Sequence, residues 1–191
     1  MKYEDILDAH SRFENDKSYQ ERTYKELIVP IKNPWDEMDS IIKFVRRWTP
    51  RVPIGRNRDQ IKKVALSLRD EFNKLEFETL ESFVFTPENE MTIRNIFEQL
   101  SSCPLKFVAT TKLMHGINPH LFIMWDQGIC IHYRCSLNSA GYIKFLQLMQ
   151  TELKEVMASH TKEEIIQQTG RSLPKLLDEY NWDRYRTSKT F

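Results

Sequence analysis

The stretch KFVATTKLMHGINPHLFIMWDQGICIHY, residues 106–133, decides how the fold is interpreted. Apolar residues dominate it, yet it contains two lysines, Lys106 and Lys112, and a single aspartate, Asp126. The spacing of its first apolar residues predicts a helix that ends at Gly116. Asp126 follows an apolar run and precedes another helical segment, so we expect it to cap the start of that helix.

Helical periodicity continues on both sides of this stretch. Asn33 before a proline and Thr86 before another are typical helix starts. No segment shows convincing strand alternation, so the sequence predicts an all-α protein of nine to eleven helices. The expected helices cover residues 3–10, 21–27, 34–48, 59–74, 77–83, 87–100 and 104–116, then a short helix after Asp126, a long one capped by Asn138 or Ser139, and two more that end the chain.

The composition is that of one packed domain. The chain has 191 residues, of which 40% are hydrophobic, and no apolar run approaches the roughly 18 residues of a membrane span. The start of the chain shows no signal-peptide core. We therefore expect one compact domain over residues 1–191, a monomer in the cytoplasm without a membrane partner.

Charge is distributed unevenly along the chain. Residues 43–63 hold eight basic side chains against Asp59 alone, a net charge of +7, whereas the whole protein carries +1. Such segregation can build a basic face that suits a polyanion, although acids from other segments could equally neutralise it. The arginines that we expect to contact phosphates are Arg46, Arg47, Arg51, Arg56 and Arg58.

The three cysteines, Cys103, Cys130 and Cys135, are too few and too irregularly spaced for a disulfide framework. A zinc site built on Cys130, Cys135 and His132 would lack the tight ligand pairs that such sites use. We expect buried, reduced thiols, no metal and no cofactor.

The segment from Leu100 to Ile131 has a specific order of parts. A helix ends, a tight SSCP turn follows, and a second helix carries Lys106 in its first turn, 20 residues before Asp126. This order resembles the helix-hairpin-helix DNA glycosylase superfamily, particularly its 8-oxoguanine glycosylase and endonuclease III branches. The resemblance implies an all-α, two-lobed, glycosylase-like fold, with one lobe at 34–123 and the other at 1–33 plus 124–191.

The resemblance also implies roles for single residues. Asp126 would be the catalytic carboxylate of a DNA glycosylase that flips out and excises a base. Lys106 would be the amine that adds an AP lyase activity, with Lys112 as a second candidate. Ser102 and Pro104 would contact phosphate at the hairpin, and the flipped base would meet Thr110, Met114, Trp125 and Trp48, with Trp35 and Trp182 as further stacking candidates.

The implied partner is double-stranded DNA that contains a damaged or modified base. An oxidised purine, an alkylated base, a uracil-type lesion and a hypermodified phage base all stay open, and so do repair and phage defence. The hairpin departs from the family because it has no glycine, which puts its phosphate contact in question. No cysteine follows Cys135, so no iron–sulfur cluster is expected. Two alternatives remain: a non-catalytic DNA-binding module, and a helical interaction protein in which Asp126 is only a cap.

Overall fold

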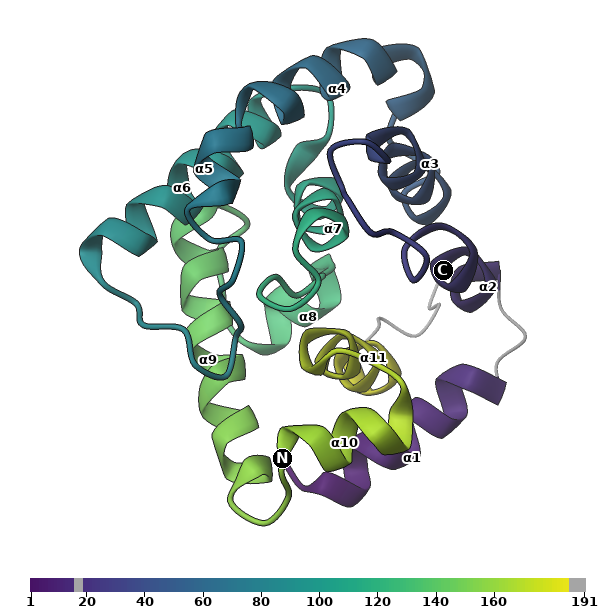
Figure 1. Ribbon diagram of the computed structural model, residues 1–191, viewed down its shortest axis with the longest axis vertical. Coiled ribbons are helices and arrows are strands. Elements are labelled where there is room, and N and C mark those ends of the chain that lie inside the picture. Colours follow the sequence, from purple (N-terminus) through teal and green to yellow (C-terminus); the bar gives the residue numbers. More distant parts are fainter. Residues whose placement is uncertain (16–18, 186–191) are drawn as a thin grey trace.

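A computed structural model describes residues 1–15 and 19–185, and within these ranges the chain is helical without strands (Figure 1). The predicted all-α class is confirmed. No helix in the described ranges combines the length and apolar character needed to cross a membrane. The helices are α1 (Tyr3–Asn15), α2 (Tyr19–Leu27), α3 (Met38–Trp48), the 3-10 helix η1 (Ile54–Asn57), α4 (Arg58–Ser67), α5 (Arg69–Asn73), α6 (Pro87–Ser102), α7 (Lys106–Ile117), α8 (Gln127–His132), α9 (Ser139–Met157), α10 (Lys162–Thr169) and α11 (Leu173–Tyr185).

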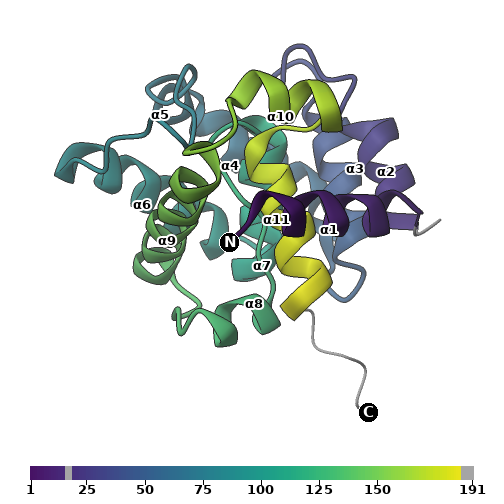
Figure 2. The same ribbon diagram turned by 90° about the horizontal axis from the view of Figure 1, so that it is seen from below.

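Helix α7 lies at the centre of the molecule and packs against both α3 and α6 (Figure 1). Gly116 makes the contact with α3 possible, because a Cβ atom there would lie 2.5 Å from a methyl group of Ile41. The first helix, α1, packs against the last, α11, as Figure 2 shows. One continuous apolar core runs from Ile6 to Tyr180. The division into two lobes stays a prediction.

A buried histidine ties three segments together around α7. The Nδ1 atom of His115 lies 2.7 Å from the carbonyl oxygen of Phe122, and its Nε2 atom lies 2.9 Å from the hydroxyl of Tyr24. A neutral ring satisfies both contacts, since Nδ1–H donates to the carbonyl and Nε2 accepts from the hydroxyl. Burial lowers the pKa of His115 to about 3.

The helix predicted at 77–83 is wrong, because this segment forms turns and leaves Phe77 90% exposed. One backbone hydrogen bond lies within the segment, from the amide of Ser82 to the carbonyl of Thr79 at 3.2 Å, and other backbone groups bond to distant parts of the chain. The amide of Leu80 donates to the carbonyl of His120 at 2.9 Å, and the side chain of Gln150 donates to the carbonyls of Leu80 and Phe83 at 2.7 Å each. These tertiary hydrogen bonds replace a helical ladder.

Several helix boundaries also differ from the prediction, and α1 continues to Asn15 instead of ending at residue 10. Helix α3 begins at Met38 rather than at Pro34, because the side-chain oxygen of Asn33 accepts the amide of Trp35 at 3.0 Å and closes a turn before the helix. The helix expected over 59–74 is broken at Leu68 into α4 and α5. The predicted caps at Thr86, Asp126 and Asn138 are confirmed, each accepting a backbone amide of the first turn.

His115 should make stability depend on pH below neutrality. The unfolded chain binds a proton at this residue near pH 6.5 and the folded chain does not, so its stabilising contribution is complete above pH 6.5 and is lost as the pH falls toward 3. We expect the free energy of unfolding to drop by about 2 kcal/mol between pH 6.5 and pH 5. Urea unfolding at both pH values measures this drop. The exposed His132 provides the control: His115→Gln should flatten the dependence, whereas His132→Gln should not, and equal slopes in both variants would contradict the assignment.

Candidate active site

Asp126 is held at the start of α8 by a rigid approach. Leu121 to Trp125 are fully buried, and the hydroxyl of Tyr142 fixes their backbone by donating to the carbonyl of Ile123 at 2.8 Å. The Oδ1 atom of Asp126 accepts the amide of Ile129 at 3.0 Å. Among the described residues no group donates to Oδ2, so one carboxylate oxygen is free for a ligand.

The Asp126 side chain lies in a cleft of about 400 Å³ that we call the Asp126 cleft. It brings together side chains from the loop after α3, from α7, from the start of α8 and from α11. Four charged side chains line it, namely Lys112, Asp126, Asp178 and Arg51. The other lining residues include Gln20, Trp48, Val52, Val108, Trp125, Ile129 and Trp182.

Lys112 is the buried amine of this cleft. Its side chain is only 8% exposed, and among the described residues it makes no hydrogen bond or ion pair. Burial lowers the pKa of Lys112, and the charges of Asp178 and Asp126 oppose that effect without cancelling it. A lysine in this environment loses part of its charge more readily than an exposed one, and an uncharged amine is nucleophilic.

Lys106, the lysine that the resemblance favours, is exposed and does not line the Asp126 cleft. It is the first residue of α7 and adopts the left-handed conformation, with φ at 58°. A non-glycine residue there is strained by roughly 1 kcal/mol. Lys106 thus occupies the conformation that a glycine would adopt without strain in a tight turn.

The hairpin itself differs from the expected one. Ser102, a phosphate contact in the resemblance, is the last residue of α6, and its hydroxyl donates to the carbonyl of Gln99 at 2.7 Å. Pro104 lies in the connecting turn rather than in the first turn of α7. Leu105 takes the cap position of α7, where it offers no side-chain acceptor. The exposed Ser102 therefore precedes the turn, and its hydroxyl bonds within α6 rather than to the start of α7.

The predicted base-pocket residues separate into two groups. Trp48 and Trp125 line the Asp126 cleft. Thr110 and Met114 do not, because both are fully buried in the core, where the hydroxyl of Thr110 donates to the carbonyl of Lys106 at 2.9 Å. Trp125 is itself 1% exposed, so an aromatic ligand in the cleft would meet the half-buried ring of Trp48 rather than these side chains.

The Asp126 cleft adjoins a wide groove of about 920 Å³ that we call the basic groove. Gln20, Pro50 and Val52 line both. Four cationic side chains line the basic groove: Lys43, Arg46, Arg47 and Arg56. Arg51 adds a fifth at the Asp126 cleft. The predicted basic run thus places positive charge beside the candidate site.

The five predicted arginines differ in how far they are neutralised. Arg58 forms an ion pair with Asp39 at 2.8 Å, and Arg47 approaches Glu26 at 3.5 Å. In contrast, Arg46, Arg51 and Arg56 have no carboxylate within ion-pair distance among the described residues and are exposed. Only these three keep their full positive charge available.

Sequence reasoning missed the part of the site that α11 contributes. Asp178 lines the cleft and is 5% exposed, and its Oδ2 atom accepts a hydrogen bond from the fully buried Lys175 at 2.8 Å. In the sequence, lysine and acids three and four residues apart resemble an ordinary solvated helix face. The apolar residues on both sides of them, in LPKLLDEYNW, were the available signal that this helix is buried all round.

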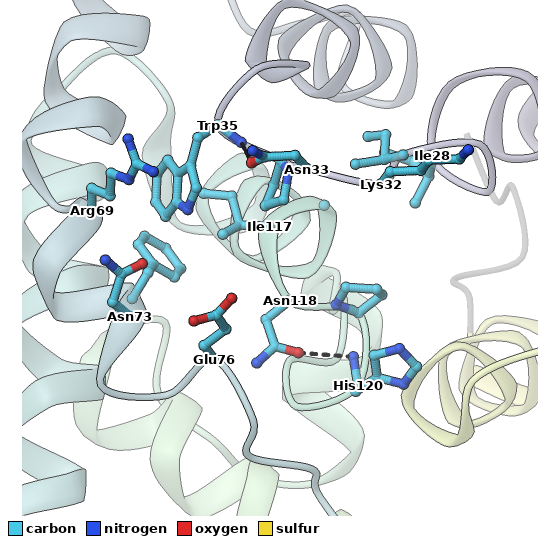
Figure 3. Close-up of a pocket in the computed structure, with 15 residues that line it drawn as sticks. Ile28, Lys32, Asn33, Trp35, Arg69, Asn73, Glu76, Ile117, Asn118 and His120 are labelled. Atoms are coloured by element: carbon cyan, nitrogen blue, oxygen red, sulfur yellow. Dashed lines mark hydrogen bonds between the residues drawn. The ribbon is translucent and has the colours of Figure 1, made fainter.

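A second cleft, of about 530 Å³, lies at the opposite end of α7 (Figure 3). Trp35 lines it, with the guanidinium of Arg69 5.7 Å from its ring centre. The side chain of Asn118 forms hydrogen bonds with the backbone there. Its Nδ2 atom donates to the carbonyl of Leu75 at 2.8 Å, and its Oδ1 atom accepts a hydrogen bond from the amide of His120 at 3.0 Å. Trp35 is therefore remote from the Asp126 cleft.

The three cysteines are free and buried, as predicted. Within residues 1–15 and 19–185, no group of three His, Cys, Asp or Glu side chains could hold a metal ion. Comparison with protein-family models, with curated proteins and with solved structures finds no match to this chain. The chemistry of the site therefore has to be argued from its own geometry.

The basic groove should bind a polyanion through its unpaired arginines. Replacing Arg46, Arg51 or Arg56 by Ala should reduce the slope of log K against log salt by about one unit each for duplex DNA, because each neutralises a phosphate. Fluorescence anisotropy at several salt concentrations measures the slope. Arg58→Ala is the matched control and should change it less, since Asp39 already neutralises that arginine. Unchanged slopes after replacement of Arg46, Arg51 and Arg56 would place the polyanion elsewhere.

Proposed function

We propose that this protein is a DNA N-glycosylase that flips out and excises a damaged or modified base. The observation that carries the proposal is that a fixed carboxylate, Asp126, and a buried amine, Lys112, line one cleft that adjoins a basic groove. The groove supplies charge for the phosphate backbone, and the cleft can receive an extrahelical base. The half-buried indole ring of Trp48 adds a surface on which a base can stack.

Asp126 has the properties that cleavage of an N-glycosidic bond requires. As the bond to the base breaks, positive charge develops on the deoxyribose, and a carboxylate fixed beside that carbon stabilises it. The bond from the Ile129 amide to Oδ1 orients the group before the substrate arrives, and Oδ2 remains to face the sugar. The same carboxylate can orient or deprotonate an attacking water.

The position of Lys112 supports assigning it, rather than Lys106, as the amine of a lyase step. In that step Nζ attacks C1′, and the base leaves with the electron pair of the N-glycosidic bond and takes up a proton. The attached nitrogen loses a proton, the C1′–O4′ bond breaks as O4′ takes up a proton, and a protonated imine forms between Nζ and C1′. Elimination from the imine then releases the 3′ phosphate and cuts the strand. Lys112 lines the cleft with Asp126, whereas Lys106 is exposed outside it.

A non-catalytic DNA-binding protein is the second candidate. The glycine-free hairpin favours it, because the strained backbone at Lys106 departs from the turn on which the glycosylase resemblance rests. Both candidates use the basic groove, so only the chemistry in the Asp126 cleft separates them.

Asp126→Asn tests the glycosylase assignment. Removing a preorganised charge should lower the rate of base release by about 10²–10³ while duplex binding stays unchanged. Mass spectrometry of bases released from duplexes with oxidised, alkylated, uracil-type and hypermodified bases measures the rate and identifies the substrate. The exposed Asp70→Asn serves as control and should retain full activity. An active Asn variant would remove Asp126 from the mechanism, and salt-sensitive binding without release of any base would favour the non-catalytic candidate.

Borohydride trapping decides the reaction type and the identity of the amine. If Lys112 attacks the sugar, wild type should form a covalent adduct with substrate DNA, Lys112→Gln should form none, and Lys106→Gln should form nearly as much as wild type. Gel shift after reduction measures the adduct, and peptide mapping locates it. Trapping lost only in Lys106→Gln would return the role to Lys106, and no trapping in wild type would leave Asp126 acting with water.

A further inference from the structure

The Asp178 carboxylate is paired with one buried lysine and lines the Asp126 cleft with another. Its Oδ2 atom accepts a hydrogen bond from Lys175 at 2.8 Å, and it lines the cleft together with Lys112. Lys175 is fully buried and Lys112 is 8% exposed. Burial raises the pKa of Asp178, and the charges of both lysines oppose that rise. Asp178 is therefore paired directly with Lys175 while it shares the cleft with Lys112.

The two lysines have very different partners. The Nζ atom of Lys175 lies 2.8 Å from Asp178 and 3.3 Å from Glu179, and 4.2 Å from the ring centre of Phe13. Although burial opposes it, the charges of these two carboxylates raise the pKa of Lys175. Lys112 has neither a hydrogen bond nor an ion pair among the described residues. Lys175 is therefore the amine that keeps its proton.

We infer that Lys175 is a positioning residue that holds the Asp178 carboxylate in a direct ion pair and thereby leaves the Lys112 amine without an ion-pair partner in the cleft. A carboxylate already paired with one cation attracts a second one less. The other charged groups at the cleft are Asp126, which favours a charged Lys112, and Arg51, which opposes it.

The groups behind Lys175 keep the arrangement in place. The Oε2 atom of Glu179 lies 2.7 Å from the Nδ1 atom of His10, and its Oε1 atom lies 3.6 Å from the guanidinium of Arg171. Glu179 is therefore shared by Lys175, His10 and Arg171. Asp178 remains the closest partner of Lys175. The inference deepens the proposed function, because an uncharged amine is the form that attacks a sugar, yet the charge of Lys112 can be measured without DNA.

Competitive acetylation of the DNA-free, full-length protein tests the inference. The extent of acetylation of each lysine is followed by peptide mass spectrometry across pH, with the exposed Lys106 and Lys63 as internal references. The midpoint of each profile reports loss of the proton, whereas its plateau reports access, so the burial of Lys112 does not obscure the result. In wild type the midpoint of Lys112 should lie below those of the two references.

Two variants should move that midpoint in opposite directions. Lys175→Met, whose side chain suits the surrounding aromatic rings, frees the charge of Asp178 and should raise the Lys112 midpoint by about one pH unit or more. Asp178→Asn removes the charge and should lower it. In the double variant the effect of Lys175→Met should vanish, because the two residues act through one contact.

Circular dichroism and thermal unfolding establish that each variant folds. If Lys175→Met does not fold, Asp178→Asn decides alone, and a Lys112 midpoint that stays or rises in that variant overturns the inference. A wild-type midpoint equal to those of Lys106 and Lys63 also overturns it. If acetylation behaves as expected but no duplex releases a base, the inference stands and the glycosylase proposal fails.

Discussion

The burial of α7 on nearly every side constrains the structure around it. Every residue from Ala109 to Ile117 is buried, so the polar side chains of this helix have only internal partners. The hydroxyls of Thr110 and Thr111 return to carbonyls of their own helix, and His115 bridges Tyr24 and Phe122. Lys112 is the exception among them in the described part of the chain: its amine bonds to none of these groups and lines the cleft instead. The geometry of the site follows from the way the core satisfies the rest of the helix.

The same burial explains why the amine and the carboxylate of the cleft are suited to different tasks. An isolated charge removed from water is disfavoured by several kcal/mol, and burial accordingly lowers the pKa of Lys112. Asp126 is only partly buried, and the amide of Ile129 fixes the orientation of its carboxylate. One cleft therefore combines a buried amine with a carboxylate held in a fixed orientation.

The sequence predicts the fold class and several helix starts because these depend on local chemistry. Apolar periodicity identifies the helices, and Thr86, Asp126 and Asn138 cap them as their types and positions predict. The segment 77–83 could not be predicted in this way, since its backbone bonds to His120 and Gln150, which lie far away in the chain. Asp178 escaped prediction for a similar reason: nothing in the segment around Asp126 indicates which later helix packs against it.

The two lysines show a finer limit of sequence reasoning. A spacing from Asp126 selects Lys106, but the face of a helix that reaches a cleft depends on where the helix begins and on its phase. Val108 and Lys112 are four residues apart and share the face that lines the cleft, whereas Lys106 precedes Val108 by two residues, roughly 200° around the helix. Because the hairpin has no glycine, Lys106 itself adopts the left-handed conformation of the turn. Lys106 lies in the strained turn of the hairpin. Lys112, six residues further along α7, provides the amine of the cleft. The roles of Lys106 and Lys112 are therefore separable by substitution, although the resemblance favours Lys106.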